Sequence, residues 1–558
     1  MAYELRGHQL VVALKQSNVC GAKEHSRKMR WNAVCDESRK YGVKWGKTTR
    51  KGNADDDCYL SLSTGSGKTS MEIIPCINQD IKIKNAGITV IEPKGDLAEV
   101  VYAMGEYYGR KVLYFNPTLP SCPSFNVLDG KEDEVIENVT TTFDMLTPDS
   151  KSFFRDMNNN LLRKALMVLK RLEEAYRDEN TGISLKPANL IALSELIHNT
   201  ENKGRMMVKE LLNIPTLNKD EEKQNQDTVN WFLNEYFADK SKVYENTSGV
   251  RTQVANLIQN KYLRKVLNPE GKSDINFERA IENGEVIAIT TALGELGGLS
   301  KYLGYFLILS YQSAIFKRKG DEDTRIAQYL YIDEFQIYSN PSFSNLLTMG
   351  RSYRVGCFLA TQSREQIAMG SGSDGKGFLS VVSANARNVI TFSGLSKEDA
   401  KYYSDDYGAE IQEQVRRGTS KQVFKLGYGA KNMNYPTESE QYSESLENIF
   451  SATDITYKEF KEITYKIVEN GTVKMGRNGV ANWIDAELNE NLKAIYRKFR
   501  EEQLALRQKV EEEEMVRRRE KNKEFLMSKN IHTSTNNSSP QKDSQIDVGK
   551  MDAKAGWG

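Results

Sequence analysis

A short segment rich in glycine and hydroxyl groups, Ser63–Ser70, constrains the fold of this chain more than any other feature. It follows the apolar run Cys58–Ser63 and precedes Met71–Ile77, which has the composition of a helix start. Gly65 and Gly67 allow backbone N–H groups to converge on phosphate oxygens, and the dipole of the following helix favours an anion there. A strand, a glycine-rich turn and a helix in this order predict a phosphate-binding loop for ATP or GTP.

The candidate nucleotide-binding residues of this loop are Thr64, Gly65, Ser66, Gly67, Lys68, Thr69 and Ser70. Lys68 is expected to reach the β- and γ-phosphates, and the Thr69 hydroxyl is expected to bind Mg²⁺. The full motif places a glycine at position 62, where this chain has Leu62. The entry to the loop is therefore expected to be tighter or differently bent.

Two adjacent carboxylates follow a second apolar run, in the segment Tyr329–Glu334. Asp333 is the candidate ligand of the Mg²⁺ shell, and Glu334 is the candidate base that orients and deprotonates the attacking water. A strand that ends in an acidic turn is common by itself. Combined with the phosphate loop, it predicts nucleotide hydrolysis.

Two further residues are candidates for catalytic roles. Gln362 ends the strand-like run Cys357–Thr361 and has the polar amide of a γ-phosphate sensor, although a plain turn residue is the alternative. Arg351, in Gly350–Arg354, is the first choice for an arginine finger that acts on the nucleotide of a neighbouring subunit, which requires a ring. A surface arginine fits the sequence equally well.

The alternation of short apolar runs with helical patterns predicts an α/β fold with a parallel sheet wrapped by helices. This rhythm stops where only helical periodicity is present, which predicts an all-α domain inserted into the sheet domain. The expected parts are a basic segment at 1–57, a nucleotide-binding domain at 58–130 and 279–480, the inserted domain at 131–278, a charged helix at 481–530 and a disordered tail at 531–558.

Composition limits the function classes. The net charge is +1, so any nucleic-acid binding must come from local patches or a lined channel. Residues 1–52 hold 12 Lys or Arg against 4 Asp or Glu, which fits either a solvated arm or a contact to DNA phosphates or anionic lipid. Six cysteines without a CxxC pair and four histidines argue against a zinc site. The most apolar stretch, 302–316, contains Gln312 and is predicted to be a buried helix.

The order and spacing of these motifs resemble the type IV secretion coupling proteins, the TraG/TraD-like ATPases of conjugation. The resemblance covers roughly residues 58–480. The matching segments are Thr64–Thr69, Ile91–Asp96, Val112–Pro117, Ser124–Asp129, Ile332–Phe335, Gly350–Arg351, Thr361–Ser363, Asn385–Gly394 and Ser396–Tyr407.

The resemblance implies a RecA-like motor domain with an inserted all-α domain, using ATP and Mg²⁺. It also implies a homo-hexamer with a central channel for single-stranded DNA, docking of the relaxase complex, and delivery to the secretion channel proteins. Most members of the family begin with two transmembrane helices, and residues 1–57 contain none. The chain is therefore similar to a soluble subset, expected to be cytoplasmic and recruited to the inner face of the membrane by a partner protein.

Two other functions are compatible with parts of the sequence. A DNA translocase of the FtsK/HerA kind would share the motor, but the inserted helical domain and Glu92–Asp96 favour a coupling protein. A substrate receptor, stabilised by nucleotide with little turnover, fits the mixed-charge C-terminal region. The Asp333–Glu334 pair argues against the receptor.

Overall fold

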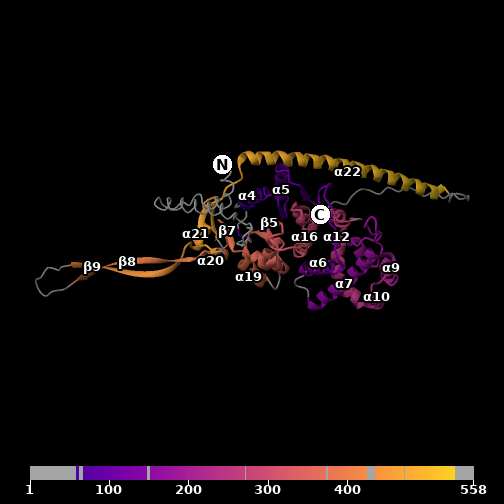
Figure 1. The fold of residues 1–558 in the computed structure, drawn as a ribbon, viewed down its shortest axis with the longest axis horizontal. Helices are drawn as coiled ribbons and strands as arrows, with labels where there is room; N and C mark the ends of the chain where they lie inside the picture. The colour runs from indigo at the N-terminus through magenta and orange to yellow at the C-terminus, as the bar shows by residue number, and fades with distance from the viewer. Residues whose placement is uncertain are drawn as a thin grey trace, which may run out of the picture. The chain divides into compact units, whose positions relative to one another are not determined.

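Figure 1 shows the computed structural model of the chain, which describes residues 58–61, 67–146, 151–269, 272–371, 375–423, 434–469 and 472–534. For residues 58–61, 412–423, 434–444 and 528–534 it describes the backbone alone. The basic segment expected at 1–57 and most of the tail expected at 531–558 lie outside these residues. The chain divides into two compact units, the first ending at Phe499 and the second beginning at Arg500, and each is described by itself.

A nine-stranded sheet organises the described part of the first unit. Seven adjacent strands are parallel, in the spatial order β7 (Asn388–Phe392), β1 (Cys58–Ser61), β6 (Val355–Thr361), β5 (Ala327–Ile332), β2 (Ala86–Glu92), β4 (Val286–Thr290) and β3 (Val112–Phe115). Every residue of β2, β4, β5, β6 and β7 is buried. Strands of a parallel sheet are buried on both faces because helices cover both, which explains their continuous apolar composition.

In the strands β2 to β7, residues on opposite faces enter two different hydrophobic cores. In β5, Tyr329 and Tyr331 pack in the core that contains buried residues of α4 (Ile74–Asp80) and α5 (Asp96–Tyr107). Leu330 and Ile332 pack in the core that contains α16 (Leu299–Phe316). The period-two geometry of a strand therefore fixes which helices cover which face. The buried α16 also confirms the helix predicted at 302–316.

Between β3 and β4 the chain forms a helical region around α7 (Ser152–Ala175), whose leucines lie at helical spacing and are buried. The other α-helices here are α6 (Glu132–Leu146), α8 (Leu190–His198), α9 (Lys203–Glu210), α10 (Lys219–Trp231), α11 (Lys242–Asn246), α12 (Ser248–Gln259), α13 (Lys261–Val266) and α14 (Phe277–Glu282). Their apolar side chains share one core with α16, so this region packs onto one face of the sheet. The domain limits of 131 and 278 stay predictions.

Residues 409–480 contain strands that the sequence pattern did not indicate. β10 (Glu462–Lys466) extends the sheet antiparallel to β7, and β13 (Arg477–Val480) pairs antiparallel with β10. β8 (Ala409–Val423) and β9 (Asn434–Asn448) form a separate two-stranded ribbon with fifteen paired positions. These strands are largely polar, so hydrophobic periodicity gives little signal for them.

The last helix, α22 (Ala486–Ser534), is long and mostly polar. Its first turns belong to the first unit, where Leu488, Leu492 and Ile495 pack against the α4–α5 side of the sheet.

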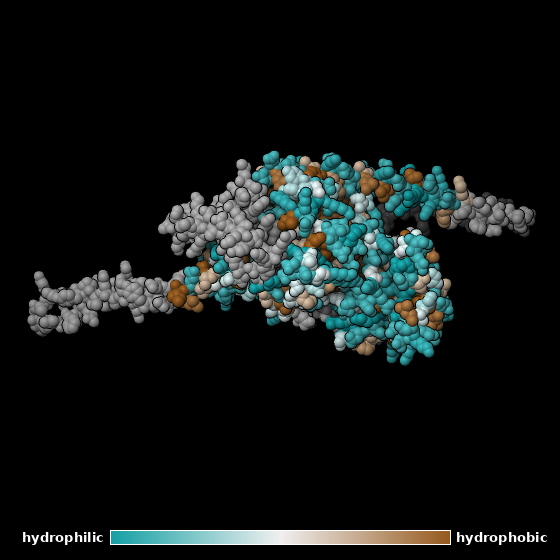
Figure 2. All heavy atoms as spheres, in the orientation of Figure 1, coloured by the Kyte–Doolittle hydropathy of each residue, from teal (hydrophilic) through white to brown (hydrophobic). Residues whose placement is uncertain are grey.

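The face in Figure 2 is mainly hydrophilic, with hydrophobic residues scattered rather than gathered. None of the helices in the described ranges has the length and apolar character needed to cross a membrane.

Gly304 marks a close approach between α16 and the loop after β5. A Cβ built on Gly304 would lie 2.4 Å from two ring carbons of Tyr338, which is fully buried. We expect Gly304→Ala to lower the free energy of unfolding by about 1–3 kcal/mol, because the ring and helix must separate. Gly298→Ala, at the start of the same helix with no atom within 4 Å of its Cβ position, is the matched control. Equal free energies of unfolding in urea for Gly304→Ala and Gly298→Ala would contradict this packing.

Candidate active site

Three adjacent strands deliver the predicted residues to one edge of the sheet. β1 leads through the phosphate-loop segment into η1 (Thr69–Ile73), Asp333 follows β5, and Gln362 follows β6. The register pairs Ser61 with Thr361 across β1 and β6. Because the strands are parallel, their carboxyl ends share this edge, where ligands of open α/β sheets bind.

The side chains of Lys68 and Thr69 meet the two carboxylates directly. Thr69 Oγ1 donates to Asp333 Oδ2 at 2.7 Å. Lys68 Nζ lies 3.0 Å from Glu334 Oε2 and 3.5 Å from Asp333 Oδ1. All three charged residues are at least 93% buried, so each depends on the others for compensation of its charge.

Glu334 is the most contacted group of the site. Its Oε2 also accepts from Gln336 Nε2 at 2.7 Å and from Gln362 Nε2 at 2.9 Å, while Oε1 accepts from Lys94 Nζ at 3.2 Å. Burial alone would raise its pKa, but the Lys68 ammonium and the other donors outweigh burial and hold the pKa below the usual value. Glu334 is therefore ionised at neutral pH.

The backbone of Glu334 has a left-handed conformation, with φ 51° and ψ 46°. Residues other than glycine enter this region at an energetic cost, and such strain concentrates at functional sites. Here the turn after β5 points the carboxylate at Lys68 and Gln362 instead of continuing the strand. Strain at this position thus accompanies the convergence of the candidate catalytic groups.

A second buried carboxylate, Glu92, shapes the neighbouring turn. It ends β2, and its two oxygens accept from the backbone N–H groups of Lys94 at 2.7 Å and Gly95 at 2.5 Å. Burial raises its pKa to about 7, although these backbone donors oppose the rise. Gly95 has φ 109°, a conformation that favours glycine, and α5 begins directly after it. The segment Glu92–Asp96 is therefore a fixed turn beside the two carboxylates.

The structure brings together Lys68, Thr69, Asp333, Glu334 and Gln362, all of which were candidates from the sequence. Gly67 has φ 90° and accepts from the Ser70 hydroxyl at 3.2 Å. Leu62, Thr64, Gly65 and Ser66 lie outside the described residues. The roles of all these residues stay predictions.

Arg351 lies elsewhere. It is exposed in η6 (Gly350–Tyr353), before the start of β6, whereas Gln362 follows the end of that strand. A seven-residue strand spans roughly 20 Å, so Arg351 cannot join the Glu334 cluster of its own chain. Its exposed position is compatible with both alternatives from the sequence, an arginine finger on a neighbouring subunit and a surface arginine, and the finger role stays a prediction.

Sequence reasoning missed Lys94 and Gln336, which also hold Glu334. The signal for Lys94 was present in the Glu92–Asp96 motif, but nothing in a single sequence tells which carboxylate its side chain reaches. Gln336 follows Glu334 by two residues, and its contact depends on the left-handed turn at Glu334. Lys94 was missed because its contact depends on which strands are neighbours in the sheet, and Gln336 was missed because its contact depends on the strained turn at Glu334.

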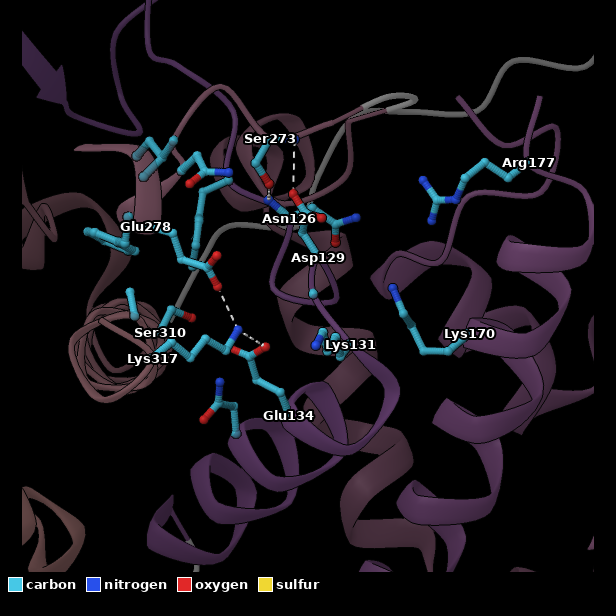
Figure 3. Close-up of a pocket in the computed structure, with 17 residues that line it drawn as sticks. Asn126, Asp129, Lys131, Glu134, Lys170, Arg177, Ser273, Glu278, Ser310 and Lys317 are labelled. Atoms are coloured by element: carbon cyan, nitrogen blue, oxygen red, sulfur yellow. Dashed lines mark hydrogen bonds and ion pairs between the residues drawn. The ribbon is translucent and has the colours of Figure 1, made fainter. Parts of the chain in front are cut away.

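A separate cavity of about 320 Å³ lies between the helical region and α16, and shares no lining residue with the site just described (Figure 3). Lys317 of α16 spans this boundary, because its Nζ contacts both Glu134 of α6 and Glu278 of α14. Asn126 and Ser273 join the two chain segments that connect the regions, through a 2.8 Å hydrogen bond. The residues that line the cavity include both cations and carboxylates, as expected for a polar boundary between the helical region and α16.

A buried lysine and a half-buried threonine after β1, facing paired carboxylates after a nearby parallel strand, define a P-loop nucleotide-binding fold. Residues 21–446 match the family model described as type IV secretory system conjugative DNA transfer, and the chain belongs to that family. The match confirms the resemblance drawn from the motifs. No curated protein matches the chain in sequence.

Solved structures of a conjugative coupling protein share the fold. The unbound form of TrwBdeltaN70 superimposes with a TM-score of 0.53 at 13% identity, covering 80% of this chain and 91% of that chain. TrwB in complex with the ATP analogue ADPNP gives 0.52 at 14% identity, covering 81% and 92%. TrwB with ADP and Mg²⁺ gives 0.51 at 12% identity, with the same coverage. At these identities the likeness confirms the predicted fold class.

Glu72 lies in η1, two residues after the phosphate-loop segment, and is 2% exposed. Burial raises its pKa to about 8, while a contact from the Cys76 thiol lowers it less. The folded chain thus keeps a proton that the unfolded chain releases above its ordinary pKa of 4.5, so stability falls as pH rises from about 5 to about 8. Glutamine does not titrate, so we expect Glu72→Gln to remove this pH dependence. The free energy of unfolding of Glu72→Gln should therefore rise relative to that of wild type as the pH increases from about 5 to about 8. The exposed Glu106→Gln is the control, and parallel pH curves for all three proteins would refute the prediction.

Proposed function

We propose that this protein is an ATP-hydrolysing motor that couples a conjugative DNA substrate to a type IV secretion channel. The observation that carries the proposal is the convergence of Lys68, Gln362 and the carboxylate of Glu334 at the sheet edge. The membership in the conjugative DNA transfer family supports the coupling role. It also favours coupling over chromosome translocation of the FtsK/HerA kind.

Nucleotide and magnesium fit the residues present. Thr69 and Asp333 offer a hydroxyl and a carboxylate oxygen within 2.7 Å of each other, and Mg²⁺ prefers such donors while keeping several waters and phosphate oxygens. Bound there, Mg²⁺ would neutralise charge on the β- and γ-phosphates. The TrwB structures with ADPNP, with ADP and Mg²⁺, and with GDPNP support a nucleotide site in this fold.

The proposed reaction is attack of water on the γ-phosphorus, with cleavage of its bond to the bridging oxygen and release of ADP and phosphate. Lys68 leaves Glu334 and binds the β- and γ-phosphate oxygens. Glu334 accepts the proton of the attacking water, and Gln362 orients that water or senses the γ-phosphate. Arg351 of a neighbouring subunit completes the site in a homo-hexameric ring, where loss of the γ-phosphate shifts the interface between two arrangements.

The partners follow from the same proposal. Single-stranded DNA passes through the channel of the ring, and the relaxase complex is docked and delivered to the secretion channel proteins. A partner protein recruits this cytoplasmic motor to the inner face of the membrane. A nucleotide-stabilised receptor with little turnover would not require Glu334 to be held by two amides and two lysines.

Two substitutions separate nucleotide binding from turnover. We expect Lys68→Ala to abolish ATP hydrolysis and weaken nucleotide binding, because it removes the phosphate ligand. Glu334→Gln should bind ATP but lose turnover by about 100-fold or more, since the amide cannot accept a proton. Steady-state phosphate release and fluorescent-nucleotide binding measure both. A wild-type rate in Lys68→Ala would exclude this site, and loss of binding in Glu334→Gln would indicate a structural role.

Single-stranded DNA should bind through its phosphates. We expect affinity to fall steeply between about 50 and about 200 mM salt and to be similar for oligo-dT and a mixed sequence of equal length. Fluorescence anisotropy on the full chain, and on a chain lacking residues 1–57, shows how much of the salt dependence the basic segment supplies. An affinity unchanged by salt would contradict the phosphate-tracking model.

A further inference from the structure

Lys94 is an exposed lysine whose ammonium group contacts the buried carboxylate of Glu334, the candidate base. Its side chain is 61% exposed, whereas the Glu334 side chain that it contacts is 4% exposed. Exposed ion pairs are worth little because water and salt screen both partners. Here one partner is enclosed and cannot turn to solvent, so the contact constrains the carboxylate more than a surface pair would.

The backbone that carries Lys94 is fixed from several directions. The Glu92 carboxylate holds the N–H groups of Lys94 and Gly95, and the Leu293 N–H donates to the Pro93 carbonyl at 2.8 Å. These bonds tie the turn to the chain after β4. The long side chain of Lys94 therefore reaches Glu334 from a rigid base, as a group that sets orientation requires.

The two oxygens of Glu334 have different donors. Oε2 is held by Lys68, Gln336 and Gln362, and Oε1 is held by Lys94. In the proposed hydrolysis, Lys68 leaves Oε2 to bind phosphate oxygens. When it moves, one acceptor position on Oε2 becomes available to water, and Lys94 is the cation that still contacts Glu334.

Resting on the proposed hydrolysis, we propose that Lys94 is a positioning residue for the general base. It holds Oε1 of Glu334, so that Oε2 faces the attacking water after Lys68 has moved to the nucleotide. The water proton transfers to Oε2, and Lys94 itself neither gains nor loses a proton. The role predicts an effect on turnover and none on nucleotide affinity.

The test compares Lys94→Gln and Lys94→Arg in the full chain with Lys84→Gln, an exposed lysine just before the opposite end of β2. We expect Lys94→Gln to lower kcat by about tenfold, the scale of one hydrogen bond to a charged group, with KM and the Kd for ADPNP within about twofold of wild type. Lys94→Arg should recover most of kcat because it restores a cation. In a Glu334→Gln background, Lys94→Gln should cause no further loss, since the group that it positions is gone.

Other results would overturn the inference. A kcat for Lys94→Gln equal to that of Lys84→Gln would show that Glu334 is oriented without Lys94. A parallel loss of kcat/KM and ADPNP affinity would make Lys94 a phosphate ligand instead. A further loss in the Glu334→Gln background would place its action elsewhere. Wild-type protein that binds ADPNP but shows no turnover would defeat the proposed function itself, which separates that failure from the failure of Lys94 alone.

Discussion

The burial of two carboxylates around one lysine at the end of the sheet is the interaction on which the candidate site depends. Asp333 and Glu334 are removed from water, and each would be costly without a partner. Lys68 compensates both, and the amides of Gln336 and Gln362 fill remaining acceptor positions on Glu334. The cluster joins segments more than 260 residues apart in the chain, so the inserted helical region must leave their register undisturbed.

That requirement explains where the helical region is attached to the sheet. The helical region leaves the sheet after β3 and returns before β4, at the side of the sheet away from β1 and β6. Its core is continuous with that of α16, and Lys317 ties α6 to α14 at the boundary. The insertion is therefore attached to one sheet face and one edge, while the strands that carry Lys68, Asp333 and Gln362 remain contiguous.

Sequence reasoning recovered the features that are encoded locally. The strand-to-loop transitions at Lys68, Asp333 and Gln362 were visible as apolar runs ending in polar groups, and parallel pairing then required them to share an edge. It missed Lys94 as a ligand of Glu334, because that contact depends on the neighbouring placement of β2 and β5 in the sheet. It also missed β10 and β13, whose polar residues are held by edge pairing with β7 rather than by their own hydrophobic pattern. The left-handed turn at Glu334 had no sequence signal, since glutamate rarely adopts that conformation.

Under the proposed hydrolysis, the same contacts give Lys68 two successive anionic partners. Glu334 Oε2 already accepts two hydrogen bonds and lies 3.0 Å from the Lys68 ammonium, which leaves little acceptor capacity for a water. Under the proposed function, a nucleotide phosphate replaces the Glu334 carboxylate as the anionic partner of Lys68. Nucleotide binding and exposure of the base would then be a single event, because both follow from the movement of one ammonium group. The chain would avoid an unpaired buried charge before ATP arrives and have an available base once it is bound.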